Sequence, residues 1–390
     1  IFKCLLLDYM DIGIVTLWQS KDNYGQILQC YALQCYLKKQ GHNAFLIRFN
    51  YNKNNSSFKK KLIKALLIYP MVKKMFTYDK RRKESELKRK NDKRNAARKF
   101  DEFRNLYISQ TEALYYSLED LKKNPPVADC YITGSDQVFG ANLKVVDNSI
   151  FFLSFVPKSA RKISYAASFG LIKYPQDRVG KLKELLDDFD FVSIREKAGV
   201  NICNSVGIPA TKVLDPVFLL SSDDYLKFVK TSKYTSPYVY IYSLNIKHPN
   251  EIMWGDLSRM MANYKLVVTH SSGYFEGDEI FSNAVYDYST ISEWLSNIYF
   301  SSLFVTTSFH GVAFSILLKK KFVYFPLYGE YARANNRVLE LLNILGLNFL
   351  VVKNTNDFEA AINTTIDWES VYGKLLPEIV FSRKMLIANL

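Results

Sequence analysis

The feature that most constrains the fold of this chain is a repeated alternation of short apolar runs with longer amphipathic stretches. Residues 12–17 form an apolar run of strand length, residues 25–40 carry apolar side chains at helical spacing, and residues 44–49 form the next run. Gly41 follows the helical stretch at the position that a helix C-cap favours. Strands that alternate with helices favour parallel sheets with right-handed crossovers. The beginning of the chain therefore predicts a β-α-β unit.

The alternation continues through two halves of the chain. The first half predicts further strands at 127–133, 162–167, 189–194 and 211–214, and helices at 118–123, 176–188 and 196–205. The second half predicts strands at 238–242, 265–269, 303–306 and 322–325, and helices near 249–263, 289–299, 311–319 and 334–345. We therefore predict an α/β fold with two Rossmann-like domains facing each other across a cleft. The expected boundaries are residues 10–220 and 221–365 for the domains and 366–390 for a C-terminal helical segment.

Composition and short motifs exclude several classes of protein. No run of about eighteen apolar residues is present, so no transmembrane helix is predicted, and we expect no secretory signal. The five cysteines are odd in number and form no Cys-x-x-Cys pair, so the sequence predicts neither a disulfide framework nor a zinc site. The chain also lacks a phosphate-binding P-loop and a dinucleotide-binding glycine motif. We expect a reducing, cytoplasmic compartment and no metal or cofactor.

Most of the positive charge lies in one segment. Residues 58–104 hold 18 basic and 6 acidic residues, a net charge of +12, whereas the whole chain carries +14. Lysines alternate there with large apolar residues, a pattern typical of a helix lying on an anionic membrane surface. A solvated charged face is the alternative. Nucleic-acid binding is not predicted, because the aromatic residues are not interleaved as a base-stacking platform requires.

Four loops follow predicted strands, where parallel sheets gather their active residues. In the last of them, His310 precedes a predicted helix that starts at Gly311 and exposes backbone N–H groups to an anion. His310 could donate a proton beside a bound phosphate or carboxylate, or it could simply cap a turn. His270 ends another predicted strand and could line the same cleft.

Two charged residues in the first half are further candidates. Arg195 suits a bidentate grip on phosphate or carboxylate, although an ion pair with Glu196 or another acid at the surface would also explain it. Asp136 follows a strand end, where it could act as a base or cap the next turn. Arg337, at the start of a predicted helix, is a second candidate anion clamp.

Taken together, these motifs resemble the polysaccharide pyruvyl transferase family, in family order over about residues 12–347. The motifs that carry the resemblance are Asn23-Tyr24-Gly25, Gly134-Ser135-Asp136-Gln137, Ser164-Tyr165-Ala166-Ala167-Ser168, Arg195-Glu196-Lys197, Leu214-Asp215-Pro216 and Ser308-Phe309-His310-Gly311. One departure concerns Thr307, because many members have Asp at that position. If that carboxylate orients the histidine in relatives, either the Thr307 hydroxyl or another acid must replace it here.

The resemblance implies a fold similar to the GT-B glycosyltransferases and transfer of a pyruvyl group from phosphoenolpyruvate to a sugar. It implies that a sugar hydroxyl pair becomes a ketal and that phosphate is released. The expected catalytic residues are His310 and Asp136; the expected donor-binding residues are Arg195, Ser308, Phe309, Gly311 and Arg337; the expected acceptor-binding or cleft residues are Asn23, Tyr24 and His270. The alternatives are a GT-B-like glycosyltransferase that uses a nucleotide sugar and a non-catalytic membrane-binding or nucleic-acid-binding module.

The basic segment leads to a first prediction. We expect the protein to attach peripherally to the inner face of the membrane, with a lipid-linked sugar as its acceptor. It should float with anionic vesicles at low salt and less at high salt, because lipid charge acts only within about a Debye length, ~8 Å at physiological salt. A variant with Lys59, Lys60, Lys61 and Lys64 changed to Gln should float less and keep its activity on a water-soluble acceptor. Failure to float at low salt would leave a solvated basic arm.

Overall fold

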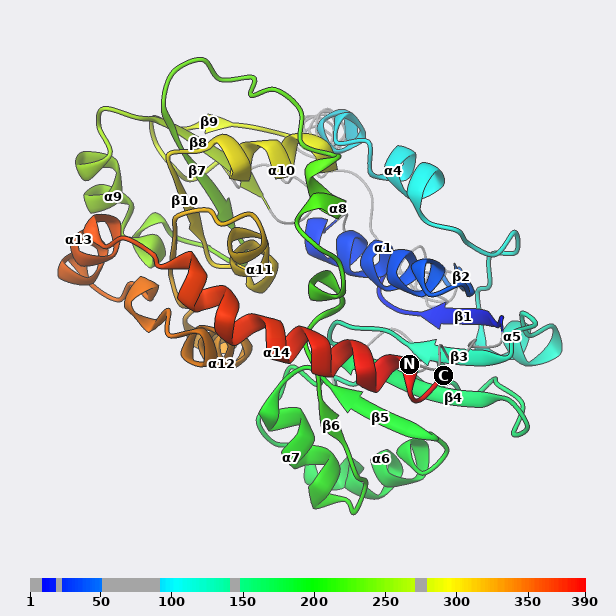
Figure 1. Cartoon of the computed structure of the whole chain (residues 1–390). Coiled ribbons are helices and arrows are strands. Elements are labelled where there is room, and N and C mark those ends of the chain that lie inside the picture. The colour runs from blue at the N-terminus through cyan, green and yellow to red at the C-terminus, as the bar shows by residue number, and fades with distance from the viewer. Residues whose placement is uncertain (1–8, 19–22, 51–91, 141–147, 271–278) are drawn as a thin grey trace, which may run out of the picture.

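The computed structural model of the chain describes residues 9–18, 23–50, 92–140, 148–270 and 279–390. Two parallel sheets dominate it, one in each half (Figure 1). The six-stranded sheet has the order β2-β1-β3-β4-β5-β6 and the five-stranded sheet the order β11-β10-β7-β8-β9. The strands of the first are β1 (Asp11–Val15), β2 (Asn43–Leu46), β3 (Cys130–Thr133), β4 (Arg161–Ala167), β5 (Phe191–Ile194) and β6 (Thr211–Lys212). Those of the second are β7 (Tyr238–Ser243), β8 (Lys265–His270), β9 (Val285–Tyr286), β10 (Leu303–Thr306) and β11 (Phe322–Tyr324).

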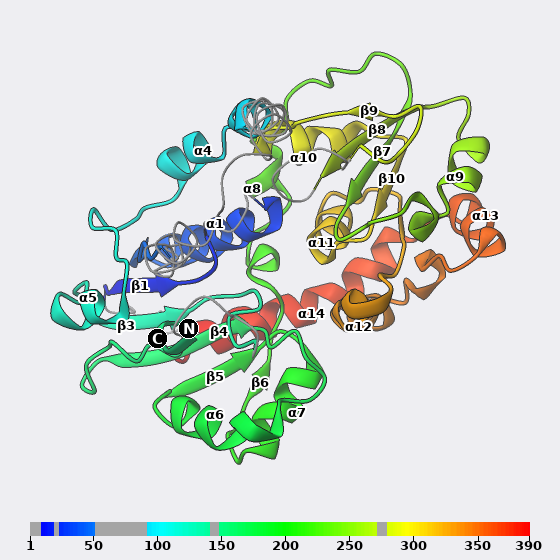
Figure 2. The ribbon, with the colours of Figure 1, turned by 180° about the vertical axis from the view of Figure 1, so that it is seen from behind.

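Helices cover both sheets (Figures 1 and 2). In the first half they are α1 (Tyr24–Lys39), α4 (Phe100–Tyr107), α5 (Leu118–Lys123), α6 (Val179–Leu186) and α7 (Lys197–Ser205). The 3-10 helix η3 (Pro216–Leu219) and the short helix α8 (Asp223–Leu226) lead into the second half. There they are α9 (Trp254–Met260), α10 (Ile291–Phe300), α11 (Phe309–Leu317), α12 (Asn335–Leu345), α13 (Thr355–Asn363) and α14 (Trp368–Ile387).

The predicted alternation of strands and helices is confirmed, and the differences have local causes. The stretch 249–263 is not one helix, because Met253 adopts a left-handed conformation (φ 51°) between a 3-10 turn and α9. Helix α11 begins at Phe309 rather than at Gly311, because the Ser308 side chain caps it. The two-residue strand β9 was not predicted, since so short a strand has no detectable period.

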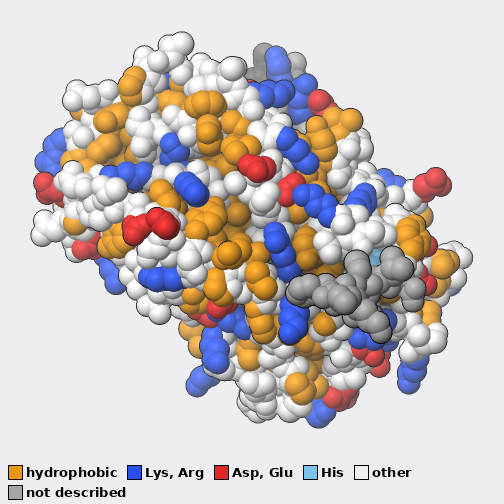
Figure 3. Space-filling view, viewed as in Figure 1, with side chains coloured by type: hydrophobic (Ala, Val, Ile, Leu, Met, Phe, Trp, Pro, Cys, Tyr) orange, Lys and Arg blue, Asp and Glu red, His pale blue; other side chains and the backbone are white. Residues whose placement is uncertain are grey.

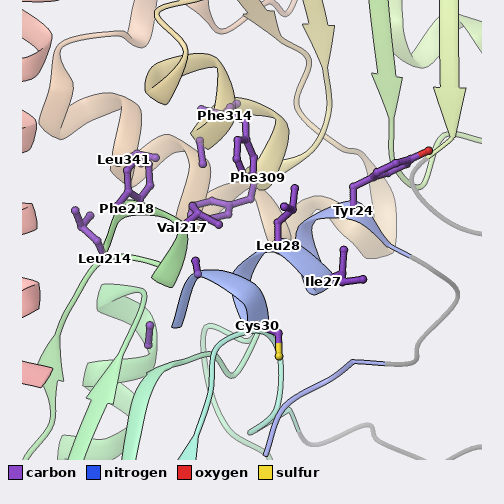
Figure 4. Packing of buried hydrophobic residues seen from close by; sticks show 14 of the residues in the cluster. Tyr24, Ile27, Leu28, Cys30, Leu214, Val217, Phe218, Phe309, Phe314 and Leu341 are labelled. Atoms are coloured by element: carbon purple, nitrogen blue, oxygen red, sulfur yellow. The ribbon is translucent and has the colours of Figure 1, made fainter. Parts of the chain in front are cut away.

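Helix α1, η3 and α11 pack together and form an apolar core between the two halves. In Figure 4, Leu28 of α1 and Val217 of η3 lie close to Phe309 of α11, so side chains from both halves share this core. Burial of aliphatic and aromatic side chains of this size contributes about 1.5–3 kcal/mol each. The two halves are therefore held together by a hydrophobic interface as well as by the chain.

Helix α14 runs from the second half back across the first (Figure 1). The Ser382 hydroxyl near its end accepts a hydrogen bond from the Leu214 amide at 2.9 Å, and Arg383 donates to the Leu219 carbonyl at 2.7 Å. The C-terminal segment thus fastens the loop around η3, which lies between the two sheets.

The basic segment is described only at its end, and residues 58–91 lie outside the described residues. Within its described end, Arg98 and Arg104 are buried, and Arg94 pairs with Glu279 at 3.2 Å. The prediction that residues 58–104 as a whole face the membrane is therefore wrong for Arg98 and Arg104, because protein already surrounds their guanidinium groups.

The surface and the helices add two observations. Basic and acidic side chains are interspersed with apolar ones on the face shown in Figure 3. Within the described parts of the chain, no helix has both the length and the apolar character needed to cross a bilayer.

Candidate functional site

The site lies where the strand order reverses in both sheets. In the first sheet β2 lies on one side of β1 and β3 on the other, and in the second sheet β8 and β10 lie on opposite sides of β7. Ligands of open parallel sheets bind beyond the carboxyl ends of the strands at such switch points. A cavity of about 400 Å³ is found there. It is lined by Leu17, Asn23, Gln26, Asp136, Gln137, Gly140, Phe169, Gly170, Leu171, Leu244, Asn245, Ser308, Phe309, His310, Tyr331, Arg333, Ala334 and Arg337.

His310 stands in the first turn of α11 and lines the cavity. Its Nε2 atom lies 3.6 Å from Oδ2 of Asp215, which the first half of the chain contributes. On the other side the ring touches the start of α1. A Cβ atom added to Gly25 would lie 2.0 Å from Nδ1 of His310. Gly25 is therefore the residue that lets the imidazole approach α1 so closely.

Asp215 is fully buried and holds several groups together. Its Oδ2 accepts hydrogen bonds from Arg195 Nη1 at 2.6 Å and from Ser135 Oγ at 3.1 Å. Its Oδ1 accepts the Val217 amide at 3.1 Å. Burial by itself would raise the pKa of Asp215, but His310 and Arg195 outweigh burial and hold the pKa of this carboxyl below its usual range. Asp215 thus stays ionised at neutral pH.

Asp215 was not predicted as a site residue, although Leu214-Asp215-Pro216 is among the motifs of the resemblance. Of the two expected alternatives for orienting His310, the Thr307 hydroxyl and another acid, Thr307 does not contribute, because its hydroxyl bonds to the backbone. Its hydroxyl donates to the Leu244 carbonyl at 3.0 Å and accepts the Leu244 amide at 2.7 Å. The acid that faces His310 is therefore Asp215, and Thr307 fastens the loop after β7.

Arg195 lies behind the cavity and not at its wall, contrary to the prediction that it contacts the donor. Its guanidinium is buried beneath the Phe309 ring, 4.8 Å from the ring centroid. Burial by itself would lower the pKa of Arg195, but Asp215, Glu196 and Asp136 together raise it. The predicted alternative was an ion pair with Glu196 or another acid at the surface; Glu196 lies 3.9 Å away and Asp215 2.6 Å away, but both pairs are buried. The main partner of Arg195 is Asp215.

Arg337, in the first turn of α12, does line the cavity. Its Nε and Nη1 atoms are buried and have no hydrogen-bond partner among the residues that the structure describes. Burial first, and then the nearby Arg195, lower the pKa of Arg337. Its guanidinium lies 5.7 Å from the Phe309 centroid, so Phe309 contacts both arginines. This arrangement favours an anion at Arg337.

Asp136 lines the cavity. It has a positive φ of 81°, and its Oδ1 accepts the Gln137 amide at 2.9 Å. The carboxylate also lies 3.9 Å from Nη2 of Arg195. A strained backbone at a cavity wall is typical of functional residues.

The remaining predicted residues divide into two groups. Asn23, Ser308 and Phe309 line the cavity. Gly311 does not offer its N–H to an anion, because that N–H donates to the Ser308 hydroxyl at 3.4 Å. His270 does not line the cavity either; it ends β8 and stacks on Tyr286, with ring centroids 5.4 Å apart.

Tyr24 is not a cleft residue but an anchor between the two halves. Its ring stacks on Trp294 of α10 with centroids 5.2 Å apart, and its hydroxyl donates to the Ser289 carbonyl at 2.5 Å. Burial raises the pKa of Tyr24 to about 12, although Arg98 partly offsets burial. The sequence placed Tyr24 beside cavity residue Asn23, but helical geometry turns its side chain away from the cavity.

Solved structures show the same overall fold. The UDP-GlcNAc 2-epimerase of Methanocaldococcus jannaschii in complex with UDP-GlcNAc and UDP is similar with a TM-score of 0.52 at 11% identity, covering 97% of this chain and 99% of that chain. The N-terminal domain of trehalose-6-phosphate phosphatase from Candida albicans is similar with a TM-score of 0.51 at 10% identity, covering 100% and 97%. At such low identity these similarities concern the fold alone, and they confirm the predicted GT-B-like arrangement of two Rossmann-like domains.

Sequence comparison gives a more specific result. No curated protein matches the sequence significantly. The family model for polysaccharide pyruvyl transferases matches residues 23–327, which include Asn23, Asp136, Arg195, Asp215 and His310.

The contact between Gly25 and His310 generates a prediction. Gly25→Ala should lower turnover by about 100-fold, because a displacement of about 1 Å of a reacting group can cost that much. Gly180→Ala is the matched control, since Gly180 lies in α6 and an added Cβ would meet nothing within 4 Å. Steady-state kinetics measure the effect, and circular dichroism checks the fold. Equal turnover of the two variants would show that the position of His310 does not limit the reaction.

Proposed function

The chain belongs to the polysaccharide pyruvyl transferase family, and we propose that it transfers the pyruvyl group of phosphoenolpyruvate onto two hydroxyls of a sugar. The sugar would be part of a glycan or a lipid-linked glycan, and the products would be a pyruvate ketal and phosphate. Family membership makes the chain a pyruvyltransferase of polysaccharide biosynthesis. Phosphoenolpyruvate as the donor and a ketal as the product are what we propose for it.

The observation that carries the choice of donor is Arg337 at the cavity wall, whose side chain has unused hydrogen-bond donors toward the described residues. Phosphoenolpyruvate has a phosphate and a carboxylate, and planar guanidinium groups bind both in bidentate fashion. Arg337 brings buried N–H groups that lack a partner among the described residues, and Arg333 lines the same cavity. These two side chains are proposed to bind the donor. Arg195 would act indirectly by holding Asp215 and the Phe309 ring in place.

His310 is proposed as the proton donor. It would protonate the methylene carbon of phosphoenolpyruvate, which places positive charge on the central carbon and makes it electrophilic. One sugar hydroxyl would then form a C–O bond to that carbon and give its proton to Asp136. A second hydroxyl would attack the same carbon as the bond to the phosphate oxygen breaks, and its proton would leave with the phosphate. Both His310 and Asp136 line the cavity, as these reaction steps require.

The acceptor is proposed to lie against the polar side chains that the first half and the loop after β7 contribute. Asn23, Gln137 and Asn245 line the cavity and carry amides that can exchange hydrogen bonds with sugar hydroxyls. A lipid-linked acceptor and peripheral attachment to the membrane remain proposals that rest on the charge of residues 58–104. Within that segment, the buried residues Arg98 and Arg104 would take no part in membrane attachment.

The donor can be tested directly. The wild-type enzyme should consume phosphoenolpyruvate and release phosphate in step with a pyruvylated acceptor, read by mass spectrometry. His310→Ala should lower turnover by about 100-fold or more, the usual scale for a lost general acid, while the fold persists. Release of a nucleotide from a nucleotide sugar, with no use of phosphoenolpyruvate, would identify a glycosyltransferase instead. A His310→Ala variant with normal turnover would remove His310 from the reaction.

The role of Arg337 leads to a separate prediction. Arg337→Lys keeps a charge but loses the planar fork, so the KM for phosphoenolpyruvate should rise by roughly tenfold or more, since a charge-assisted hydrogen bond contributes about 1.5–3 kcal/mol. Arg259→Lys is the control, because Arg259 is exposed and its ion pair is with Asp256 in its own helix. If KM rises for the sugar and not for phosphoenolpyruvate, Arg337 belongs to the acceptor side of the cavity.

A further inference from the structure

Among the described residues, the charged group paired with His310 comes from the other half of the molecule. His310 follows β10 in the second sheet, whereas Asp215 precedes η3 at the end of the first sheet. The 3.6 Å between His310 Nε2 and Asp215 Oδ2 therefore spans the interface between the halves. Both groups are almost completely shielded from solvent there.

Asp215 is held in place more firmly than a surface acid could be. Arg195, Ser135 and the Val217 amide bind its two oxygens at 2.6–3.1 Å. These contacts leave Oδ2 directed toward the imidazole and keep the carboxylate ionised. The nearby Thr307 hydroxyl is taken up by the Leu244 backbone and does not bind Asp215.

We propose that Asp215 is the positioning residue of His310, and that its carboxylate orients the imidazole through Nε2 and stabilises the protonated ring across the interface between the two halves. The proposal rests on the proposed role of His310 as proton donor. Thr307, the residue before the Ser-Phe-His-Gly motif, carries no charge, and its hydroxyl bonds to the Leu244 backbone.

The surrounding charges explain why the position of Asp215 matters. Within the described ranges, the charged side chains around His310 are Asp215 and Arg195 on the buried side and Asp136, Arg333 and Arg337 along the cavity. Asp215 lies between two cations, the Arg195 guanidinium and the protonated imidazole. Without its charge, Arg195 would face the imidazolium with no anion between them and would disfavour the protonated ring.

The proposal also links catalysis to the packing of the two halves. Gly25 at the start of α1 supports one side of the His310 ring, and Asp215 supports the other. Both belong to the first half, while the ring itself belongs to the second. The proton donor is therefore oriented only when α1, η3 and α11 are packed together.

The test observes His310 directly. The chain has 4 histidines, so ¹⁵N imidazole resonances can be resolved by NMR and assigned with a His310→Ala variant. In Asp215→Asn the titration midpoint of His310 should fall by about one pH unit or more, the scale for the loss of an opposite charge at this distance. Thr307→Val should leave the midpoint unchanged. An unchanged midpoint in Asp215→Asn, or an equal fall in Thr307→Val, would overturn the proposal.

Two further measurements cover the case in which Asp215→Asn fails to fold. The double variant Asp215→Asn with Arg195→Gln removes both charges of the buried pair, so neither is left unpaired. Its His310 titration midpoint should lie below that of the wild type. If Asp215→Asn also folds, the midpoint of the double variant should lie above that of Asp215→Asn. In the wild type, the neutral His310 ring should carry its proton on Nε2, the nitrogen that faces Asp215. A ring protonated on Nδ1 would overturn the proposal without any variant.

Activity separates this proposal from the proposed function. In Asp215→Asn, kcat should fall and its alkaline limb should move to lower pH, while the KM for phosphoenolpyruvate changes little. If the NMR midpoint moves as expected but His310→Ala keeps normal turnover, then the Asp215–His310 pair stands and the catalytic role of His310 falls. If the midpoint does not move but His310→Ala is inactive, then the catalytic role of His310 stands and the Asp215–His310 pair falls.

Discussion

The buried pair of Arg195 and Asp215, 2.6 Å apart, is the interaction on which the rest of the structure depends. A charge taken out of water is tolerated only when it is paired and hydrogen-bonded, and removing one partner of such a pair costs about 3–5 kcal/mol. Ser135 and the Val217 amide complete the pairing. They also bring the loop after β3 and the start of η3 to one point. Because η3 packs against α1 and α11, the same pair fixes the interface between the two halves and the floor of the cavity.

The interface is built so that its geometry is shared with the site. Tyr24 enters the second half and stacks on Trp294, while the next residue, Gly25, leaves room for His310. Two adjacent residues of one helix thus serve two purposes, anchoring one half to the other and accommodating the imidazole. Any change in the packing of α1 would alter both, because the helix is rigid and its first turn contacts both groups.

The sequence predicted the parts that depend on local period and failed where contacts between distant segments decide. Parallel strands, their order of appearance and the loops at their carboxyl ends follow from apolar runs and helical spacing, which led to His310, Asp136 and Arg337. The pairing of Asp215 with His310 could not be predicted, because nothing local at Asp215 reveals which residue of the other half it will meet. The burial of Tyr24 and the capping of the Gly311 N–H by Ser308 were missed for a related reason: both depend on the direction of a side chain, which neighbouring positions do not specify.

Phe309 explains how two arginines can serve different purposes a short distance apart. Its ring contacts both guanidinium groups, at 4.8 Å from Arg195 and 5.7 Å from Arg337. On the buried side, Asp215, Glu196 and Asp136 surround Arg195 and raise its pKa against the effect of burial. On the cavity side, burial and the positive charge of Arg195 lower the pKa of Arg337. Asp136 and Glu196 act on Arg337 too, but they do not offset burial and Arg195 there, whereas at Arg195 the acids outweigh burial. An anionic donor bound at Arg337 would supply negative charge in the cavity that His310 also lines, so the distribution of acids that stabilises the fold would also favour the proposed placing of the donor near the proposed proton donor.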